Sequence, residues 1–140
     1  QTNLQKLVEG EFPNMPMNEI DLSSDILEGL SHLHNLMPHP IVHRDLKPSN
    51  ILICRPHPNS KARAMIADLG LSKQLEDATK ESFTTTAGKA MGSMGWRAPE
   101  ILQQMFASTT GDNRLKLSLK LDIFPTGCLL FFLTTAGPIR

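Results

Sequence analysis

The sequence contains few aromatic residues and few cysteines. Only 5% of its 140 residues are aromatic and none is Tyr, which leaves little bulky material for packing a large core. The two cysteines, Cys54 and Cys128, lie far apart, and neither belongs to a Cys-x-x-Cys pair. These absences exclude a disulfide framework and a zinc knuckle, and they favour a reducing compartment.

Net charge and long hydrophobic runs are also missing. The 14 Lys and Arg residues balance 14 Asp and Glu residues, which argues against a chain built mainly to coat nucleic acid or an anionic membrane. The longest apolar run, Cys128–Leu133, is far too short to span a bilayer, and no signal-peptide pattern occurs. Hydrophobic residues make up 40% of the chain and charged residues 20%, which is the composition of a globular protein with no membrane segment.

Apolar periodicity and proline positions predict four helices. A short helix over residues 2–9 is followed by a longer one that begins after the N-cap Asn18 and ends before Pro38. A third helix is expected over residues 98–106, and a very apolar one from Asp122, which should be buried on all sides. The core-facing stripe of the second helix comprises Ile26, Leu27, Leu30 and Leu33.

Two short apolar runs predict a β-hairpin. Residues 51–53 and 64–67 have the length of strands, and the Pro- and Asn-rich residues between them form the connection. Residues 72–95 are polar, rich in Ser and Thr and without periodicity, so we expect a long exposed loop there. Residues 107–120 are polar and basic, and they have the character of an insertion.

Three short motifs occur in a fixed order around this hairpin. Residues 43–50 read HRDLKPSN, which matches the H-R-D-x-x-x-x-N pattern of the protein kinase catalytic loop. Residues 68–70 read DLG, where kinases have D-F-G, and residues 98–100 read APE, which closes a 33-residue segment counted from Asp68. The chain therefore resembles the eukaryotic protein kinase family, and Lys47 follows the pattern of its serine/threonine branch.

The resemblance implies an α+β, protein-kinase-like fold, represented by part of the C-terminal, large and mainly helical lobe with a short catalytic-loop hairpin. Residues 1–140 would form one partial kinase domain with a catalytic loop at 43–50, an activation segment at 68–100 and a central helix from about residue 122. The sequence has no G-x-G-x-x-G motif and no V-A-I-K-like strand. We therefore expect the small lobe and the late helices of the large lobe to be absent from it.

The resemblance also assigns the phosphoryl-transfer residues and the cofactors ATP and Mg²⁺. Asp45 would accept or orient the proton of a Ser or Thr hydroxyl in a protein substrate, and Lys47 would contact the transferring phosphate. Asn50 and Asp68 would hold Mg²⁺ through oxygen atoms and, with Lys47, would bind the nucleotide. The predicted hairpin places Asn50 and Asp68 at the same end, as a shared metal ion requires.

A second group of residues would support this machinery. His43 would be structural rather than a general base, and Asp122 would brace the backbone of the catalytic loop. Leu69 would replace the usual Phe as an apolar plug beside Gly70. In the family, Glu100 pairs with an arginine from a later region, and here it would lack that partner.

The activation segment would carry the regulatory hydroxyl groups. A phosphate adds close to two negative charges and pairs readily with arginine, so Arg44, directly before Asp45, is the expected partner. The alternative is a hydroxyl-rich surface loop that is not modified. Trp96 belongs either to the shelf that binds the peptide substrate or simply to the core. The candidates for phosphorylation are Ser82, Thr84, Thr85 and Thr86.

Several longer stretches narrow the resemblance. LSHLHNL at 30–36, GSMGWRAPEIL at 92–102 and LDIFPTGCLLFFL at 121–133 are similar to the inositol-requiring endoplasmic-reticulum stress sensors, membrane-anchored kinases fused to an endoribonuclease. This implies a parent protein in that membrane, with its kinase on the cytosolic side, that forms homodimers or oligomers and trans-autophosphorylates. RNA would be bound only by a downstream domain absent here. The alternative is a truncated or pseudokinase chain that acts as an interaction or regulatory module.

Overall fold

The computed structural model describes residues 2–10, 18–55, 57, 60–76, 82–84, 92–107 and 115–135. Its α-helices are α1 (Leu4–Val8), α2 (Glu19–His34), α3 (Pro99–Ala107) and α4 (Ile123–Thr135). Its strands are β1 (Thr2–Asn3), β2 (Ile41–Val42), β3 (Ile51–Cys54), β4 (Arg63–Ile66), β5 (Lys73–Gln74), β6 (Ser82–Thr84) and β7 (Leu115–Leu117). The 3-10 turns are η1 (Pro48–Asn50), η2 (Leu69–Leu71) and η4 (Leu119–Asp122).

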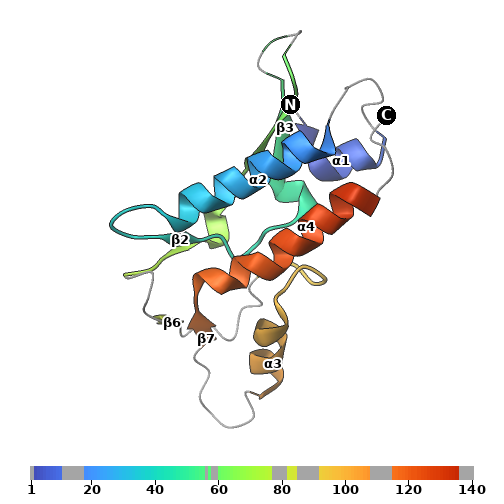
Figure 1. Cartoon of the computed structure of the whole chain (residues 1–140). Coiled ribbons are helices and arrows are strands. Elements are labelled where there is room, and N and C mark those ends of the chain that lie inside the picture. The colour runs from blue at the N-terminus through green and yellow to red at the C-terminus, as the bar shows by residue number, and fades with distance from the viewer. Residues whose placement is uncertain are drawn as a thin grey trace.

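The two long helices, α2 and α4, lie side by side, and α3 is set apart from both (Figure 1). Strand β4 packs against α2, so the hairpin of β3 and β4 is held beneath this helix. The loop over residues 43–50 leads from β2 to β3, and its first two residues bond to Asp122, which lies directly before α4 and also contacts His34 at the end of α2. This arrangement brings the end of one helix, the start of another and the base of the hairpin to one place.

Helix α2 begins where the sequence predicts. The side chain of its N-cap, Asn18, accepts the backbone N–H of Ile20 at 2.8 Å, which satisfies one of the free donors of the first turn. Its buried residues are Leu22, Ile26 and Leu30, which are spaced four residues apart along one face. The prediction that Leu27 belongs to this stripe is wrong, because 47% of its surface is exposed. A period of four residues places Leu27 on the neighbouring face, away from β4.

The predicted hairpin is present, and it belongs to a three-stranded antiparallel sheet with the order β1-β3-β4, in which β3 is central and β4 is an edge strand. Ile51 lies opposite Ile66, so the two strands meet at the end nearest the loop over residues 43–50. The carboxylate of Asp25 in α2 accepts the edge-strand N–H of Ala64 at 2.8 Å and pairs with the guanidinium of Arg63 at 2.7 Å. These contacts fix the sheet against α2 and satisfy a backbone donor on its open edge.

Helix α4 begins at Ile123, one residue after the predicted start, with Pro125 in its first turn, where a missing N–H is tolerated. Its buried residues are Pro125, Thr126, Leu129 and Leu133. The expectation of burial on all sides is wrong, because Ile123 is 57% exposed and Phe131 is 69% exposed. One face of α4 packs on α2 and the hairpin, and the opposite face is open among the described residues.

Part of the expected loop over residues 72–95 is strand. Strand β5 pairs with β2, and β6 pairs with β7, which itself lies inside the expected insertion at 107–120. Strands of two or three residues are too short for a pattern of alternation to identify them. Both pairings join segments far apart in the sequence, which is why a local pattern predicts a loop.

The buried apolar residues form two clusters. The larger one joins α1, α2, the hairpin and α4, and the smaller one joins β2, β5, α3, β7 and η4. Leu46 belongs to the larger cluster and Val42 to the smaller one, and both are almost fully buried. The polar residues between Val42 and Leu46 are therefore held between two apolar anchors.

The corrected stripe of α2 predicts a contrast between two leucines. We expect Leu30→Ala to lower the free energy of unfolding by about 3 kcal/mol, because Leu30 is only 4% exposed and its removal leaves a cavity. Leu27→Ala on the exposed face should change it by about 0.5 kcal/mol or less. Urea unfolding followed by circular dichroism measures both, and equal losses would contradict the assigned face.

Candidate active site

The loop over residues 43–50 is held at its start by one buried carboxylate, that of Asp122. Asp122 is fully buried, and its two oxygens accept the backbone N–H groups of His43 at 2.7 Å and Arg44 at 2.8 Å. His34, at the end of α2, places its Nε2 atom 2.9 Å from the same carboxylate. The contacts compensate for taking the carboxylate out of water, and they join α2, α4 and the loop at one point.

The backbone of Arg44 shows how tightly this loop is held. Arg44 has φ of +71°, a left-handed conformation that side-chain-bearing residues rarely adopt. Such a conformation persists only when surrounding contacts impose it, and the bond from the Arg44 N–H to Asp122 is one of them. Burial lowers the pKa of the Arg44 guanidinium, while the charge of Asp122 acts in the opposite direction.

His43 ties the loop to the far side of the hairpin. Its side chain is fully buried, Nε2 lies 3.0 Å from the carbonyl oxygen of Ala67, and Nδ1 accepts the backbone N–H of Asp45 at 3.3 Å. The two contacts fit a neutral ring with its proton on Nε2, since Nδ1 serves as the acceptor. Both ring nitrogens are thereby used inside the fold.

Asp45 stands at the centre of a dense polar network. Its Oδ1 accepts the N–H of Ser93 at 2.9 Å and the Ser93 hydroxyl at 3.0 Å. Its Oδ2 lies 2.7 Å from Nζ of Lys47 and accepts Nδ2 of Asn50 at 3.1 Å. Burial acts to raise the pKa of Asp45, but the hydrogen bonds from Lys47 and Ser93 outweigh it and hold this pKa below its usual value. The carboxylate is therefore charged at neutral pH.

The hairpin brings Asn50 and Asp68 to one end. The carbonyl of Asn50 accepts the N–H of Ala67 at 2.9 Å, which places the two residues on adjacent chains directly before Asp68. The Asn50 side chain donates through Nδ2 to the Asp45 backbone at 2.9 Å, so its Oδ1 is the atom suited to a cation. One amide oxygen and one carboxylate fit Mg²⁺, which takes few protein ligands and keeps phosphates and water for the rest.

Asp68 and its neighbours lie at the surface. Asp68 has φ of +64°, and its side chain accepts the N–H of Gly70 at 3.2 Å. The prediction that Leu69 is a buried plug is wrong, because its side chain is 47% exposed. The left-handed conformation of Asp68 directly precedes η2, whose two leucines, Leu69 and Leu71, are both partly exposed.

Residues 92–97 close the site from the other side, and sequence analysis did not single out their central residue, Ser93. Lys47 donates to the Ser93 hydroxyl at 2.7 Å. Gly92 has φ of +77°, and a Cβ there would lie 2.7 Å from the Arg44 carbonyl oxygen. The guanidinium of Arg97 donates to the Gly92 carbonyl at 2.9 and 2.6 Å. The sequence feature that could have pointed to Ser93 is the glycine directly before it, near the end of the predicted activation segment.

Comparison with known proteins decides the family. A family model described as the protein kinase domain matches residues 1–139. The chain belongs to the protein kinase domain family. Among solved structures, the crystal structure of the yeast RNA Pol II CTD kinase CTDK-1 complex matches with a TM-score of 0.67 and 24% identity, over 97% of this chain and 38% of that chain. This match confirms the predicted kinase fold.

Curated relatives confirm the resemblance to the stress sensors. Serine/threonine-protein kinase/endoribonuclease ireA of Aspergillus fumigatus is 33% identical over 96% of this chain, and the sensor for unfolded proteins in the ER ire1 of Schizosaccharomyces pombe is 38% identical over 96%. Serine/threonine-protein kinase/endoribonuclease IRE2 of Homo sapiens is 34% identical over 98%. The chain spans 14% of the length of each of these proteins.

The predicted activation segment, residues 68–100, is described only in part. Ser82 and Thr84 lie on β6, whereas Thr85 and Thr86 lie outside the described residues. Arg44 donates through Nη2 to the carbonyl of Ser72 at 3.3 Å, so its side chain reaches the start of the segment. Glu100 lies in the first turn of α3 and is partly buried.

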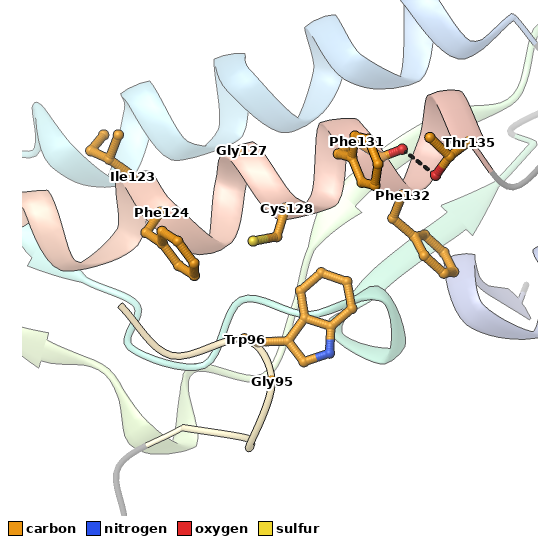
Figure 2. A pocket seen from close by; sticks show the side chains of 9 residues that line it. All are labelled: Gly95, Trp96, Ile123, Phe124, Gly127, Cys128, Phe131, Phe132 and Thr135. Atoms are coloured by element: carbon orange, nitrogen blue, oxygen red, sulfur yellow. Dashed lines mark hydrogen bonds between the residues drawn. The ribbon is translucent and has the colours of Figure 1, made fainter. Parts of the chain in front are cut away.

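Trp96 packs against α4. Its ring meets the ring of Phe132 edge to face, with centroids 6.0 Å apart, and it joins the rim of the larger core cluster. Figure 2 shows Trp96 below α4, where it lines one side of an apolar groove of about 510 Å³ together with Phe124, Cys128 and Phe131. Of the two roles considered for Trp96, these contacts support core packing. The groove leaves part of its ring accessible.

The buried carboxylate yields a stability prediction. Asp122→Asn should lower the free energy of unfolding by about 2 kcal/mol, because an amide places a donor against one of the buried N–H groups. Asp21→Asn is the matched control, since Asp21 pairs at 2.9 Å with Lys61, whose side chain is 81% exposed. We expect that control to cost about 0.5 kcal/mol or less. Urea unfolding and amide hydrogen exchange at His43 and Arg44 provide the measurement.

The close approach of Gly92 yields a second prediction. Gly92→Ala and Gly95→Ala both place a side chain at positive φ, which costs about 1 kcal/mol in each case. Only Gly92→Ala also drives a Cβ into the Arg44 carbonyl, so it should destabilise more. Loss of the Ser93 contact should also raise the pKa of Asp45, as measured by carboxyl-carbon NMR titration. An unchanged pKa of Asp45 in Gly92→Ala would contradict the idea that the close approach of Gly92 to Arg44 holds Ser93 against Asp45.

Proposed function

We propose that this chain carries the phosphoryl-transfer residues of an ATP- and Mg²⁺-dependent serine/threonine protein kinase. The observation that carries the proposal is the Asp45 network: a charged, nearly buried carboxylate with Lys47 and Asn50 on the same loop. Transfer of a phosphoryl group needs positioned charges more than covalent chemistry, and this network supplies them.

Each residue has a distinct part in the proposed reaction. Asp45 orients the substrate hydroxyl and takes its proton, while Lys47 places a cation beside the transferring phosphate. Asn50 and Asp68 hold Mg²⁺ through oxygen atoms at the base of the hairpin. When bound, ATP supplies the phosphoryl group, and Mg²⁺ neutralises charge on its phosphates. His43 and Asp122 act as positioning residues, because their contacts are to the backbone of the loop.

We further propose that the parent protein is a stress-sensor kinase of the kind that the relatives' names describe. It would lie at the endoplasmic reticulum with this domain on the cytosolic side, form homodimers or oligomers, and trans-autophosphorylate at Ser82, Thr84, Thr85 or Thr86, with Arg44 as the partner of the added phosphate. RNA would be handled only by a separate endoribonuclease domain. In the described part of the chain, no helix is long and apolar enough to cross a membrane.

We also propose an assignment of the segments of this chain within a kinase domain. Residues 1–140 correspond to part of a kinase domain, with a catalytic loop at 43–50, an activation segment at 68–100 and α4 as the central helix. One observation favours a second candidate, a non-catalytic module: the sequence holds no G-x-G-x-x-G motif to cover ATP phosphates. A chain acting by association alone would retain Asp45 without using it.

Activity measurements separate the two candidates. We expect the chain expressed with its native flanking sequence to phosphorylate a Ser/Thr peptide in the presence of Mg²⁺ and ATP, and residues 1–140 alone to show no activity. Asp45→Asn should lower the rate at least about 100-fold, because the proton acceptor is lost. Asp21→Asn, on the exposed face of α2, is the control that should retain activity. Equal activity in Asp45→Asn and the parent would overturn the proposed role.

A further inference from the structure

Helix α2 and strand β4 run in the same direction and meet at successive turns of the helix. Asp25 contacts Arg63 and Ala64 near the start of β4. Gly29, one turn later, lies against the end of β4, where an added Cβ would be 3.4 Å from Cδ1 of Ile66. Four helix residues rise about 6 Å and two strand residues about 6.6 Å. The two elements therefore keep in step, and a contact at one turn fixes the position of β4 along the helix.

The Asp25 carboxylate makes this contact with the backbone of β4. Its Oδ2 accepts the N–H of Ala64 at 2.8 Å, while its Oδ1 accepts Nε of Arg63 at 2.8 Å and lies 2.7 Å from Nη2 of the same guanidinium. The carboxylate side chain is only 8% exposed. Because it bonds to a guanidinium and to a backbone donor at once, it cannot rotate without losing a bond to one of them. Asp25 thus determines where Ala64 lies relative to α2.

The end of β4 leads directly to the proposed metal ligand Asp68. Ala67 follows the strand, and its N–H bonds to the carbonyl of Asn50 at 2.9 Å, so Asp68 comes directly after a residue that is already held in place. Only three residues separate Ala64 from Asp68 in the sequence. A displacement of β4 along α2 would therefore move Asp68 as well.

The other end of α2 holds the loop that carries the proposed proton acceptor. His34 lies 2.9 Å from the Asp122 carboxylate, which bonds to the backbone N–H groups of His43 and Arg44. Helix α2 is thus a common support, with Asp25 holding the hairpin and His34 holding the loop. The helix therefore helps to set the distance between the proton acceptor and the metal ligand.

From these contacts we propose that Asp25 is a positioning residue for the Mg²⁺ ligand Asp68. The proposal rests on the kinase function proposed above. Asp25 acts through the backbone of β4 and touches neither the metal ion nor the nucleotide. Groups that orient a metal ligand contribute about 10- to 100-fold to metal affinity, and we expect the lower end of this range because Asp25 acts through a strand.

Binding of Mn²⁺, a paramagnetic probe for a Mg²⁺ site, tests the proposal without relying on activity. Electron paramagnetic resonance measures free Mn²⁺ in the presence of a non-hydrolysable ATP analogue and the protein with its native flanking sequence. Asp25→Ala should weaken Mn²⁺ binding about 10-fold. Asp25→Asn should weaken it less, because an amide oxygen still accepts one of the two partners, and amide hydrogen exchange at Ala67 should rise in both variants. Unchanged Mn²⁺ affinity in both would overturn the proposal.

Two control variants separate positioning from loss of charge and from loss of stability. Asp21→Ala removes the same charge one turn earlier, where the partner is Lys61 with an 81% exposed side chain, so Mn²⁺ affinity should stay within about twofold. Leu30→Ala destabilises the fold through a buried residue of the same helix and should also keep its Mn²⁺ affinity. A loss of affinity in either control equal to that in Asp25→Ala would contradict positioning by Asp25.

Kinetics with a Ser/Thr peptide give a second readout. Asp25→Ala should raise KM for Mg²⁺·ATP about 10-fold while kcat at saturating Mg²⁺ and KM for the peptide change less than about threefold. A fall in kcat with KM for Mg²⁺·ATP unchanged would overturn the role of Asp25 alone, because the parent would still be a kinase. Absence of both Mn²⁺ binding and phosphorylation in the parent would overturn the proposed kinase function and this proposal with it.

Discussion

The buried carboxylate of Asp122 is the constraint on which the site depends. Removing a carboxylate from water is costly unless its oxygens are fully bonded, and Asp122 is bonded by two backbone N–H groups and His34. The two N–H groups belong to a stretch with no regular structure, in which Arg44 adopts a left-handed conformation. The same contacts that satisfy the charge therefore set the path of the loop, and the path of the loop sets the position of Asp45.

The hairpin of β3 and β4 also fixes the position of the loop over residues 43–50. His43 bonds to the carbonyl of Ala67, and Asn50 accepts the N–H of the same residue, so both ends of the loop over residues 43–50 are tied to the chain just before Asp68. Asn50 and Asp68 flank paired strands, since Ile51 lies opposite Ile66 in the register of β3 and β4. The backbone hydrogen bonds of the hairpin therefore set where the two proposed metal ligands lie relative to each other.

Sequence reasoning worked where a residue's environment follows from local pattern, and it failed where a distant partner decides. The order of the three motifs located Asp45, Asn50 and Asp68, and the N-cap Asn18 located the start of α2. Burial of Leu27 and Leu69 depends on which neighbours cover them, and a period alone does not report that. Ser93 was visible only as one hydroxyl among many, because its contact with Asp45 joins residues 48 positions apart in the chain.

The crowding around Asp45 fixes the orientation of its carboxylate. Lys47 and Asn50 lie on the same loop, whereas Ser93, 48 positions away in the chain, contributes both its N–H and its hydroxyl. Because each carboxylate oxygen has two of these partners, a rotation of the group would break several contacts at once. The proposed proton acceptor is therefore rigid in position, which is the property that positioned catalysis demands.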